Sequence, residues 1–275
     1  MRNLFIRILV ASIFAPLLIF LAYQGRFYFL FLVEALIFLG LYEFHSIAKA
    51  KEAELSLFLL IPLGLLIGWF SFLGGEKYVL LILFLAFLSG SFYQILKNGT
   101  KKASSNIAFF ILGTIYVPFF FSHLILIRQL PNYLGLEYKI GGLWVIFILV
   151  CVWFCDTLAY FIGAPLGKYQ LAPNISPKKT IEGAIGGVVG ALGGAIFSYY
   201  LFLNFISIKQ LLLLSFLIGI VGQIGDLMES SFKREVGLKD SSTIIPGHGG
   251  ILDRFDSLLF VSPLVYYYLR FFIYN

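Results

Sequence analysis

Acidic and basic side chains alternate in one polar run of this chain, residues 231–256, which reads SFKREVGLKDSSTIIPGHGGILDRFD. Lys and Arg neutralise phosphate oxygens, and Asp supplies the hard oxygen ligands that Mg²⁺ prefers beside waters and substrate phosphates. Only 12% of all residues are charged, so this concentration predicts a site for a polyanion and its metal ion. The candidates in the run are Lys233, Arg234, Lys239, Asp240, His248, Gly249, Gly250, Asp253, Arg254 and Asp256.

Three carboxylates flank the ends of two apolar segments. Asp226 closes one segment, and Asp253 and Asp256 precede the next. Because Asp253 and Asp256 are three residues apart, a helix that begins there would place both on one face. Acidic residues are also favoured at helix N-termini for capping alone. Three carboxylates beside several cations favour metal binding, so we expect Asp226, Asp253 and Asp256 to be the metal ligands.

A Gly-rich turn, Pro246-Gly-His-Gly-Gly250, lies within the same run. Its glycines free the backbone to approach a ligand and to present N–H groups to anionic oxygens. His248 could transfer a proton or hydrogen-bond a phosphate, although a loop histidine near water is ordinary. A basic loop could also serve membrane topology alone, but a topological anchor does not need the interleaved acids.

A second polar segment, residues 163–183, combines two adjacent lysines with hydroxyls just before a Gly-rich stretch. A helix that begins there would favour an anion at its N-terminus. Asp156 lies within the preceding apolar segment, where an ionisable residue is costly and is either functional or structurally paired. The candidates for substrate binding are Asp156, Lys168, Ser176, Lys178, Lys179, Thr180 and Glu182, with Asp240, Gly249 and Gly250 of the first run.

The elements that hold these residues are predicted to be membrane helices. With 60% hydrophobic residues, the chain is too apolar for a soluble domain, whose apolar share is roughly 45–50%. A barrel would show short alternating strands instead of long apolar runs. We therefore expect an all-α integral membrane protein, a polytopic bundle of about nine transmembrane helices. The expected spans are 4–23, 28–47, 56–74, 78–96, 106–127, 142–163, 184–205, 210–228 and 257–273.

Two functional parts are expected within this membrane domain. Residues 1–140 are nearly pure apolar helix and short loop, and would serve packing, dimerisation or lipid access, whereas residues 141–275 carry the catalytic site. Glu34, within a span, is a candidate for function or for an interhelical hydrogen bond. Glu43 and His45 lie near a span end, where they can reach water.

Several other features are expected to be structural. The first span follows two arginines as a signal peptide would, but no convincing cleavage site follows it, so we expect a retained helix. Cys151 and Cys155 share one helix face and are interpreted as inert packing residues. The glycines between Gly183 and Gly194 form a small-residue stripe that allows close helix packing.

The basic residues indicate orientation rather than nucleic-acid binding. They lie in short loops between spans, where lipid headgroups and topology explain the net charge of +6. With nine spans, 14 of the 20 Lys and Arg residues fall on the side of the N-terminus. The positive-inside rule then places the N-terminus and the polar run in the cytoplasm. Seven of those 14 lie in the two segments predicted to do chemistry, so the topology depends strongly on them.

Two motif regions resemble the phosphatidate cytidylyltransferases, also called CDP-diacylglycerol synthases. The family signature is similar to Lys233-Arg234, Lys239-Asp240, Pro246-x-His248-Gly-Gly250 and Asp253-Arg254-x-Asp256. The family's second conserved region is similar to Asp156-Thr-x-Ala-Tyr160, Gly163, Gly167-Lys168 and Ser176-Pro-Lys-Lys-Thr-x-Glu-Gly183. The likeness covers about residues 150–260, and the N-terminal half resembles the family only in being apolar and multi-span.

The resemblance implies that CTP and phosphatidic acid give CDP-diacylglycerol and pyrophosphate. It implies Mg²⁺ as cofactor, which we expect in a two-cation site, and a multi-pass protein of the bacterial inner membrane that forms a homodimer. Asp226 and Asp253 would bind metal, with Asp256 as a third ligand or behind the first two. The cations expected to hold phosphates of CTP or pyrophosphate are Lys233, Arg234, Lys239 and Arg254. The residues expected to hold the lipid phosphate or the nucleotide are Ser176, Lys178 and Lys179.

Two rival functions remain open at this point. A CTP-dependent polyprenol or dolichol kinase-like enzyme would share the membrane site, the nucleotide and the metal, but would release CDP instead of pyrophosphate. A transporter would use Asp156, Glu34 and the Gly-rich helices as a substrate or ion path. The transporter leaves the polar run at 231–256 unexplained.

Overall fold

Helices form nearly all of the structure. The computed structural model describes residues 2–242, 244 and 249–274, with side chains from residue 12 onward. The longer helices are α1 (Arg2–Gln24), α2 (Arg26–Ala50), α3 (Leu57–Gly74), α4 (Val79–Tyr93), α5 (Ala103–Thr114), α6 (Phe120–Tyr133), α7 (Lys139–Leu166), α8 (Ile181–Leu201), α9 (Ile208–Glu235) and α10 (Leu252–Tyr268). Short helical turns continue several of them: η1 (Gly75–Tyr78), η2 (Gln94–Asn98), η3 (Ile115–Phe119) and η4 (Leu269–Ile273).

Among the described residues, six helical stretches are long and apolar enough to cross a membrane. They are Arg26–Ala50, Leu57–Asn98, Ala103–Tyr133, Lys139–Leu166, Ile181–Leu201 and Ile208–Glu235. The predicted helical membrane protein is therefore confirmed, whereas the count of nine spans is not. The stretch Leu57–Asn98 contains two of the expected spans, 56–74 and 78–96, because α3 and α4 follow one another in the chain and pack together as separate helices.

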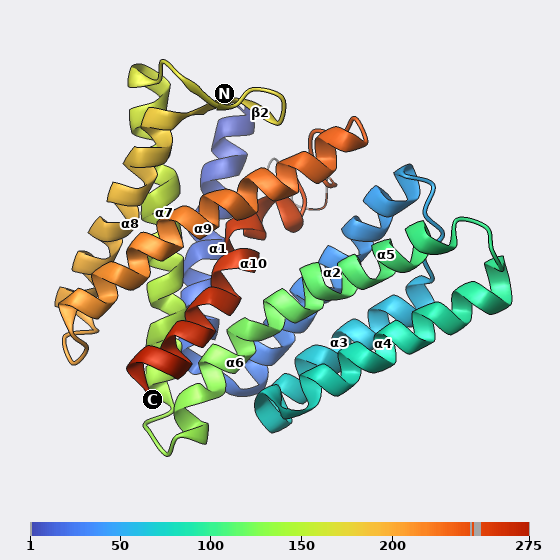
Figure 1. The fold of residues 1–275 in the computed structure, drawn as a ribbon. Coiled ribbons are helices and arrows are strands. Elements are labelled where there is room, and N and C mark those ends of the chain that lie inside the picture. Colours follow the sequence, from blue (N-terminus) through green and yellow to red (C-terminus); the bar gives the residue numbers. More distant parts are fainter. Residues whose placement is uncertain (1, 243, 245–248, 275) are drawn as a thin grey trace.

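The helices form two groups around a shared centre (Figure 1). Helices α7, α8 and α9 pack together on one side, and α3, α4 and α5 pack on the other. Between the groups, α10 packs on α9 and α6. The end of the molecule that holds the start of α1 also holds the end of α9 and a small β-hairpin, and the C-terminus lies at the opposite end (Figure 1).

Close packing of α7 and α8 depends on glycine, as the small-residue stripe predicts. A Cβ atom at Gly190 would lie 2.3 Å from the backbone oxygen of Phe154, and one at Gly194 would lie 3.1 Å from Cα of Cys151. Such distances leave no room for a larger residue. Cys151 and Cys155 are free and buried on the α7 face that meets these helices, so their interpretation as packing residues is confirmed.

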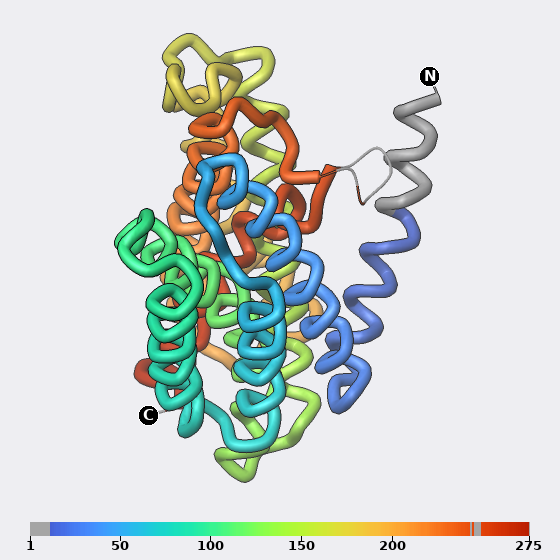
Figure 2. The backbone as a smooth tube through the Cα atoms, turned by 90° about the vertical axis from the view of Figure 1, so that its right-hand side faces the viewer, coloured from blue at the N-terminus to red at the C-terminus, as the bar shows by residue number. Residues whose placement is uncertain are grey.

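One buried arginine fastens the lower end of α1. Arg128 of α6 is 1% exposed and donates hydrogen bonds to the backbone oxygens of Ala22 at 2.8 Å, Tyr23 at 2.9 Å and Tyr138 at 2.6 Å. The last carbonyls of a helix lack partners within it, so the guanidinium satisfies groups that burial would otherwise penalise. α1 and α2 diverge from this fastened end (Figure 2).

Described parts of both polar segments form regular secondary structure. The segment 163–183 contains β1 (Gln170–Ala172) and β2 (Ser176–Thr180), which pair antiparallel and interrupt the all-α pattern. The polar run at 231–256 begins inside α9, which continues seven residues beyond the expected end at 228. Lys233 and Arg234 stand in its last turn, where the helix dipole favours positive charge.

Candidate active site

An acid from a distant helix holds the start of α10. Glu43 of α2 is 1% exposed. Its Oε1 accepts hydrogen bonds from Ser242 Oγ at 2.6 Å and from the backbone N–H of Ile251 at 2.8 Å. Its Oε2 accepts from Ser241 Oγ at 2.8 Å and from the N–H of Leu252 at 2.9 Å. The expectation that Glu43 reaches water is therefore wrong, because its carboxylate satisfies the unpaired N–H groups at a helix N-terminus.

Four donors surround Asp253 in the first turn of α10. Its Oδ1 accepts a hydrogen bond from Lys233 Nζ at 2.5 Å. Its Oδ2 accepts from Ser241 N and Oγ, both at 2.9 Å, and from Gly250 N at 2.7 Å. Burial raises the pKa of Asp253, but the Lys233 ammonium and the two backbone N–H groups lower it more, so the pKa lies below its ordinary value. Lys233 is itself buried and lies 2.5 Å from Glu229 Oε2.

A second acidic pair lies where α9 touches α10. A Cβ atom at Gly225 would lie 2.7 Å from the backbone oxygen of Asp256, so the two helices meet at this glycine. The neighbouring residue, Asp226, forms an ion pair with Lys179 Nζ of β2 at 2.5 Å. Asp256 Oδ1 accepts a hydrogen bond from the N–H of Ser257 at 2.6 Å. The contact at Gly225 thus brings carboxylates from two helices to one place.

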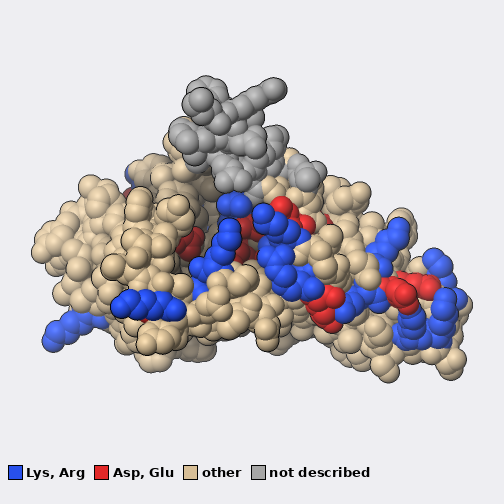
Figure 3. Space-filling model, turned by 90° about the horizontal axis from the view of Figure 1, so that it is seen from above, with Lys and Arg blue, Asp and Glu red and all other residues tan. Residues whose placement is uncertain are grey.

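A third acid comes from α7. Asp156 lies close enough to Asp226, Lys179 and Arg254 for their charges to interact. Its side chain is exposed although it belongs to a membrane helix, as expected for a residue that lines a hollow. Figure 3 shows such a hollow on the face seen from above, with acidic atoms recessed between Lys and Arg side chains. Asp156, Asp226, Asp256, Lys179 and Arg254 are therefore brought together from four elements.

The two adjacent lysines lie on a strand, and this separates them. Successive side chains of a strand point to opposite faces. Lys179 turns toward Asp226, and Lys178 is exposed to solvent. Ser176, at the start of β2, pairs with Ala172 of β1. One lysine therefore belongs to the acidic hollow and the other to its rim.

Two predicted substrate ligands hold the hairpin against α8. Thr180 Oγ1 accepts a hydrogen bond from the N–H of Gly183 at 3.2 Å and is the N-cap of α8. Glu182 Oε2 accepts from the N–H of Tyr169 at 3.4 Å. Lys168 precedes β1 and is exposed. These bonds fix the position from which Lys179 reaches α9.

Other residues of the polar run lie at the rim. Arg234 donates through Nε to the backbone oxygen of Ile175 at 3.2 Å and through Nη1 to that of Leu238 at 2.8 Å, which ties α9 to the hairpin. Lys239 and Asp240 are exposed. His248, predicted to act in catalysis, lies outside the described residues.

The two described glycines of the turn serve the loop itself. Gly249 has a φ of 85°, which favours glycine. A Cβ atom at Gly250 would lie 2.0 Å from Ser241 Oγ and 2.5 Å from both carboxylate oxygens of Glu43. The close approach predicted for a ligand is therefore made by the protein's own side chains at Gly250.

The fit of a metal ion differs among the acids. Within the described part of the chain, no three His, Cys, Asp or Glu side chains converge as a ready-made metal site. Mg²⁺ commonly takes only one or two carboxylates beside waters and substrate phosphates, and Asp226 with Asp256 matches that demand. Glu229 Oε1 is buried with no hydrogen-bond partner in the described residues, and Glu229 lies close enough to Asp256 for their charges to interact. Asp253, with four donors, fits better as the residue that positions the loop.

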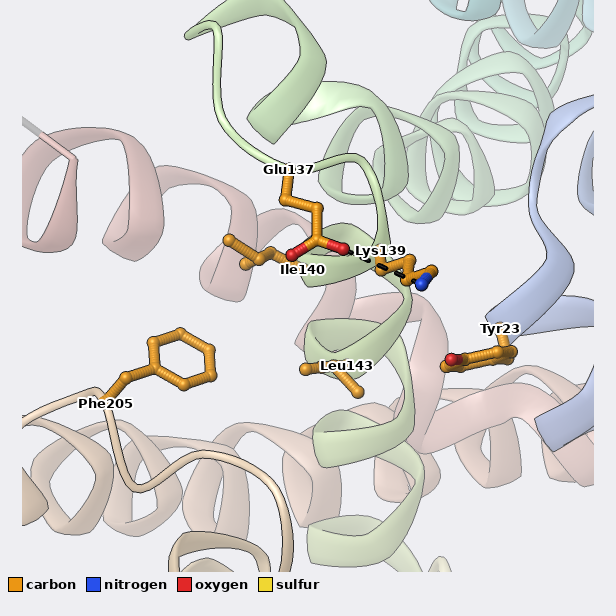
Figure 4. A pocket seen from close by; sticks show the side chains of 6 residues that line it. All are labelled: Tyr23, Glu137, Lys139, Ile140, Leu143 and Phe205. Atoms are coloured by element: carbon orange, nitrogen blue, oxygen red, sulfur yellow. Dashed lines mark ion pairs between the residues drawn. The ribbon is translucent and has the colours of Figure 1, made fainter.

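A separate pocket of about 340 Å³ lies at the opposite end of the molecule (Figure 4). It is lined by Tyr23, Glu137, Lys139, Ile140, Leu143 and Phe205. Its charged pair, Glu137 and Lys139, is 3.8 Å apart and exposed, so the charges largely satisfy each other in solvent. None of the predicted site residues lines this pocket, and it is no candidate for the chemistry.

Sequence reasoning missed two acids that shape the site. Glu229 precedes Lys233 by four residues, a spacing that predicts an ion pair on one helix face and could have identified it. Glu43 carried the general signal of an acid in an apolar helix, but nothing local indicates that its partners follow about 200 residues later. Its role depends on the packing of α2 against α10.

The chain is similar to known proteins along nearly its whole length. The family model described as cytidylyltransferase family matches residues 5–272. A phosphatidate cytidylyltransferase of Bacillus subtilis is 37% identical over 271 residues, which cover 97% of each chain. Proteins of the same name are 31% identical in Thermotoga maritima, over 97% of this chain and 96% of the relative, and 35% identical in Synechocystis, over 96% and 95%.

Proposed function

Because this chain belongs to the cytidylyltransferase family, we propose that the acidic hollow between α7, α9, α10 and β2 is where it transfers the cytidylyl group of CTP to phosphatidate. The chain is a nucleotidyltransferase, a CTP:phosphatidate cytidylyltransferase of phospholipid synthesis, and a multi-pass membrane protein. Its products are CDP-diacylglycerol and pyrophosphate.

One observation supports this location above the others. Asp156, Asp226 and Asp256 come from three helices and lie near two cations, Lys179 and Arg254, at one hollow. Three carboxylates gathered in this way repel one another, and a purely structural role would not require them to lie so close together. A bound metal ion would neutralise the acids, and a bound polyphosphate would neutralise the cations beside them.

The reaction needs charge neutralisation more than proton transfer. A phosphate oxygen of phosphatidate attacks the α-phosphorus of CTP, the new P–O bond forms, and the bond to the β-phosphate breaks with its electrons leaving on pyrophosphate. The nucleophile is already anionic, so no general base is required. Lys179 and Arg254 lie where negative charge gathers, and Lys178, Arg234 and Lys239 at the rim would meet the outgoing phosphates.

The cofactor we propose is Mg²⁺, in a site for two cations. Asp226 and Asp256 would hold it, with the buried Oε1 of Glu229 nearby. Bound there, Mg²⁺ would neutralise the phosphate oxygens and orient the α-phosphate. The metal role predicted for Asp253 stays a prediction, and its four hydrogen bonds favour a role in holding the loop beside the hollow.

The location and assembly of the protein are also proposals. The inner membrane, with the hollow on the cytoplasmic side, agrees with the bacterial relatives and with the excess of basic residues on that side. Labelling of a cysteine placed at exposed Lys239 in intact and in lysed cells tests the orientation. The homodimer stays a prediction, which light scattering of the detergent-purified chain tests.

The deciding experiment follows the two halves of CTP separately. Purified protein in liposomes receives phosphatidate, Mg²⁺ and CTP labelled at either the α- or the γ-phosphate, with each component omitted in turn. We expect α-label in the lipid and γ-label in pyrophosphate. With a polyprenol in place of phosphatidate, γ-label in the lipid and release of CDP would instead establish the kinase-like reaction. The Asp226→Asn variant should lose transfer, and Glu137→Gln, at the opposite end, should keep it.

A further inference from the structure

A narrow apolar crevice separates α1 from the rest of the bundle. Side chains from five helices line it, among them Leu18 of α1, Leu32 of α2, Leu124 of α6, Leu149 of α7 and Phe255 of α10. Its free space is only about 20 Å³, room for about one water molecule. All the side chains that line the crevice are apolar, so none of them has a polar group that would require a water molecule in the gap.

The crevice leads along α7 to the acidic hollow. Val145 and Leu149 line it, and Asp156 follows Leu149 by seven residues, which is close to two full helical turns. The three side chains therefore stand on one face of α7, with Asp156 roughly 10 Å farther along the axis. On α10, Phe255 of the crevice is adjacent to Asp256 of the hollow. On both helices, apolar side chains of the crevice thus lie within about two turns of an acid of the hollow.

α1 is fastened to the bundle at one end. Arg128 binds its last carbonyls, and the chain turns into α2 through Gly25 and Arg26, whose φ angles of 68° and 48° make a sharp hinge. Above that hinge the helix diverges from α2 (Figure 2). Its outer side chains, such as Phe14 and Phe20, are 45% and 55% exposed. Since α1 packs on α7 and α2, an outward swing of α1 would widen the crevice while the other helices keep their contacts with one another.

We propose that this crevice receives an acyl chain of phosphatidate, and later of CDP-diacylglycerol, and that α1 moves outward to admit it. The inference rests on the proposed function, because it takes the lipid phosphate to react at the hollow. A lipid whose headgroup lies there must extend its chains along an adjoining apolar surface. Acyl methylenes are disfavoured in water, so an apolar path beside Asp156 is preferred over the aqueous hollow for them.

A photoreactive substrate tests the occupant with the unaltered protein. Phosphatidate with a diazirine in one acyl chain is irradiated with the full chain in liposomes, and the labelled residues are mapped by mass spectrometry. We expect label on Leu18, Leu32 and their neighbours in the crevice, and its loss on adding excess phosphatidate but not phosphatidylcholine. Label confined to lipid-facing side chains, or label that both lipids reduce equally, would overturn the proposal.

A matched pair of variants tests whether the crevice matters for turnover. Leu18→Trp fills it, whereas Leu17→Trp places the same group on the neighbouring residue, which is 43% exposed on the outer face of α1. For Leu18→Trp we expect kcat/KM to fall at least about tenfold with dioleoyl phosphatidate and to stay within about twofold with dihexanoyl phosphatidate. The Leu17 variant should match the wild type with both.

The outcomes separate this inference from the proposed function. If the unaltered protein transfers the cytidylyl label to neither lipid, the proposed function fails. If it transfers label normally but Leu18→Trp changes both substrates equally, or neither, the proposed function stands and the crevice is not an acyl site. Normal activity on the short-chain lipid also shows that the Leu18 variant is folded.

Discussion

The Asp253→Asn variant is expected to destabilise the protein as well as to impair transfer. Asn keeps one oxygen acceptor and replaces the other with an N–H₂ donor, so it must face either Lys233 or the backbone donors of Ser241 and Gly250 with the wrong group. The Asp253 and Lys233 side chains are 5% and 9% exposed. Removing one partner of a buried ion pair costs about 3–5 kcal/mol.

Glu229 still neutralises Lys233 in this variant, so the lower end of that range, about 3 kcal/mol, is the expected loss. For a chain of this size, the loss corresponds to a fall in melting temperature of about 6–12 °C. A thiol-reactive dye on the detergent-purified protein provides the assay, because Cys151 and Cys155 are buried until the helices separate.

Asp256→Asn is the matched control for this prediction. Its amide oxygen can still accept the hydrogen bond from the N–H of Ser257, so the melting temperature should stay within about 2 °C of the wild type while transfer is lost. Equal melting temperatures for the Asp253 and Asp256 variants would refute the reasoning, since they would mean that Asp253 does not anchor the loop.

Four further outcomes are expected. Asp226→Asn should lower kcat about 10²–10³-fold without loss of fold, and unchanged transfer would remove it from the site. Lys179→Met should raise the KM for CTP or lower kcat while α8 keeps its cap, and a far-ultraviolet spectrum is the control. Glu43→Gln should expose the segment 241–252 to limited proteolysis, because two of four donors then face an N–H₂ group, and wild-type cleavage rates would contradict that role. Chelation of divalent cations should abolish transfer and added Mg²⁺ should restore it; activity that survives chelation would argue against the proposed cofactor.

Much of the site was visible in the sequence because its residues are chemically out of place. Charges in an apolar chain are costly unless they are used, so Asp156 within a span and the polar run at 231–256 stood out before any fold was known. The close approach of α7 and α8 was also predictable, since a stripe of glycines serves little purpose except contact.

The different roles of those residues could not be predicted from the sequence. Asp253 and Asp256 have the same chemistry and a helical spacing, yet one is enclosed by donors and the other lies beside the α9 contact at Gly225. Lys178 and Lys179 were equivalent until a hairpin placed them on opposite faces. The difference depends on which elements pack nearby.

The sequence by itself determined the membrane class, the reaction family and the set of charged candidates, because composition and motif chemistry are local properties of the chain. The tertiary structure decided which candidates meet. Glu43 and the start of α10 are about 200 residues apart, and only the packing of α2 against the loop makes that acid a cap. Contacts at such separation leave no periodicity or spacing in the sequence, since their geometry arises when the helices assemble.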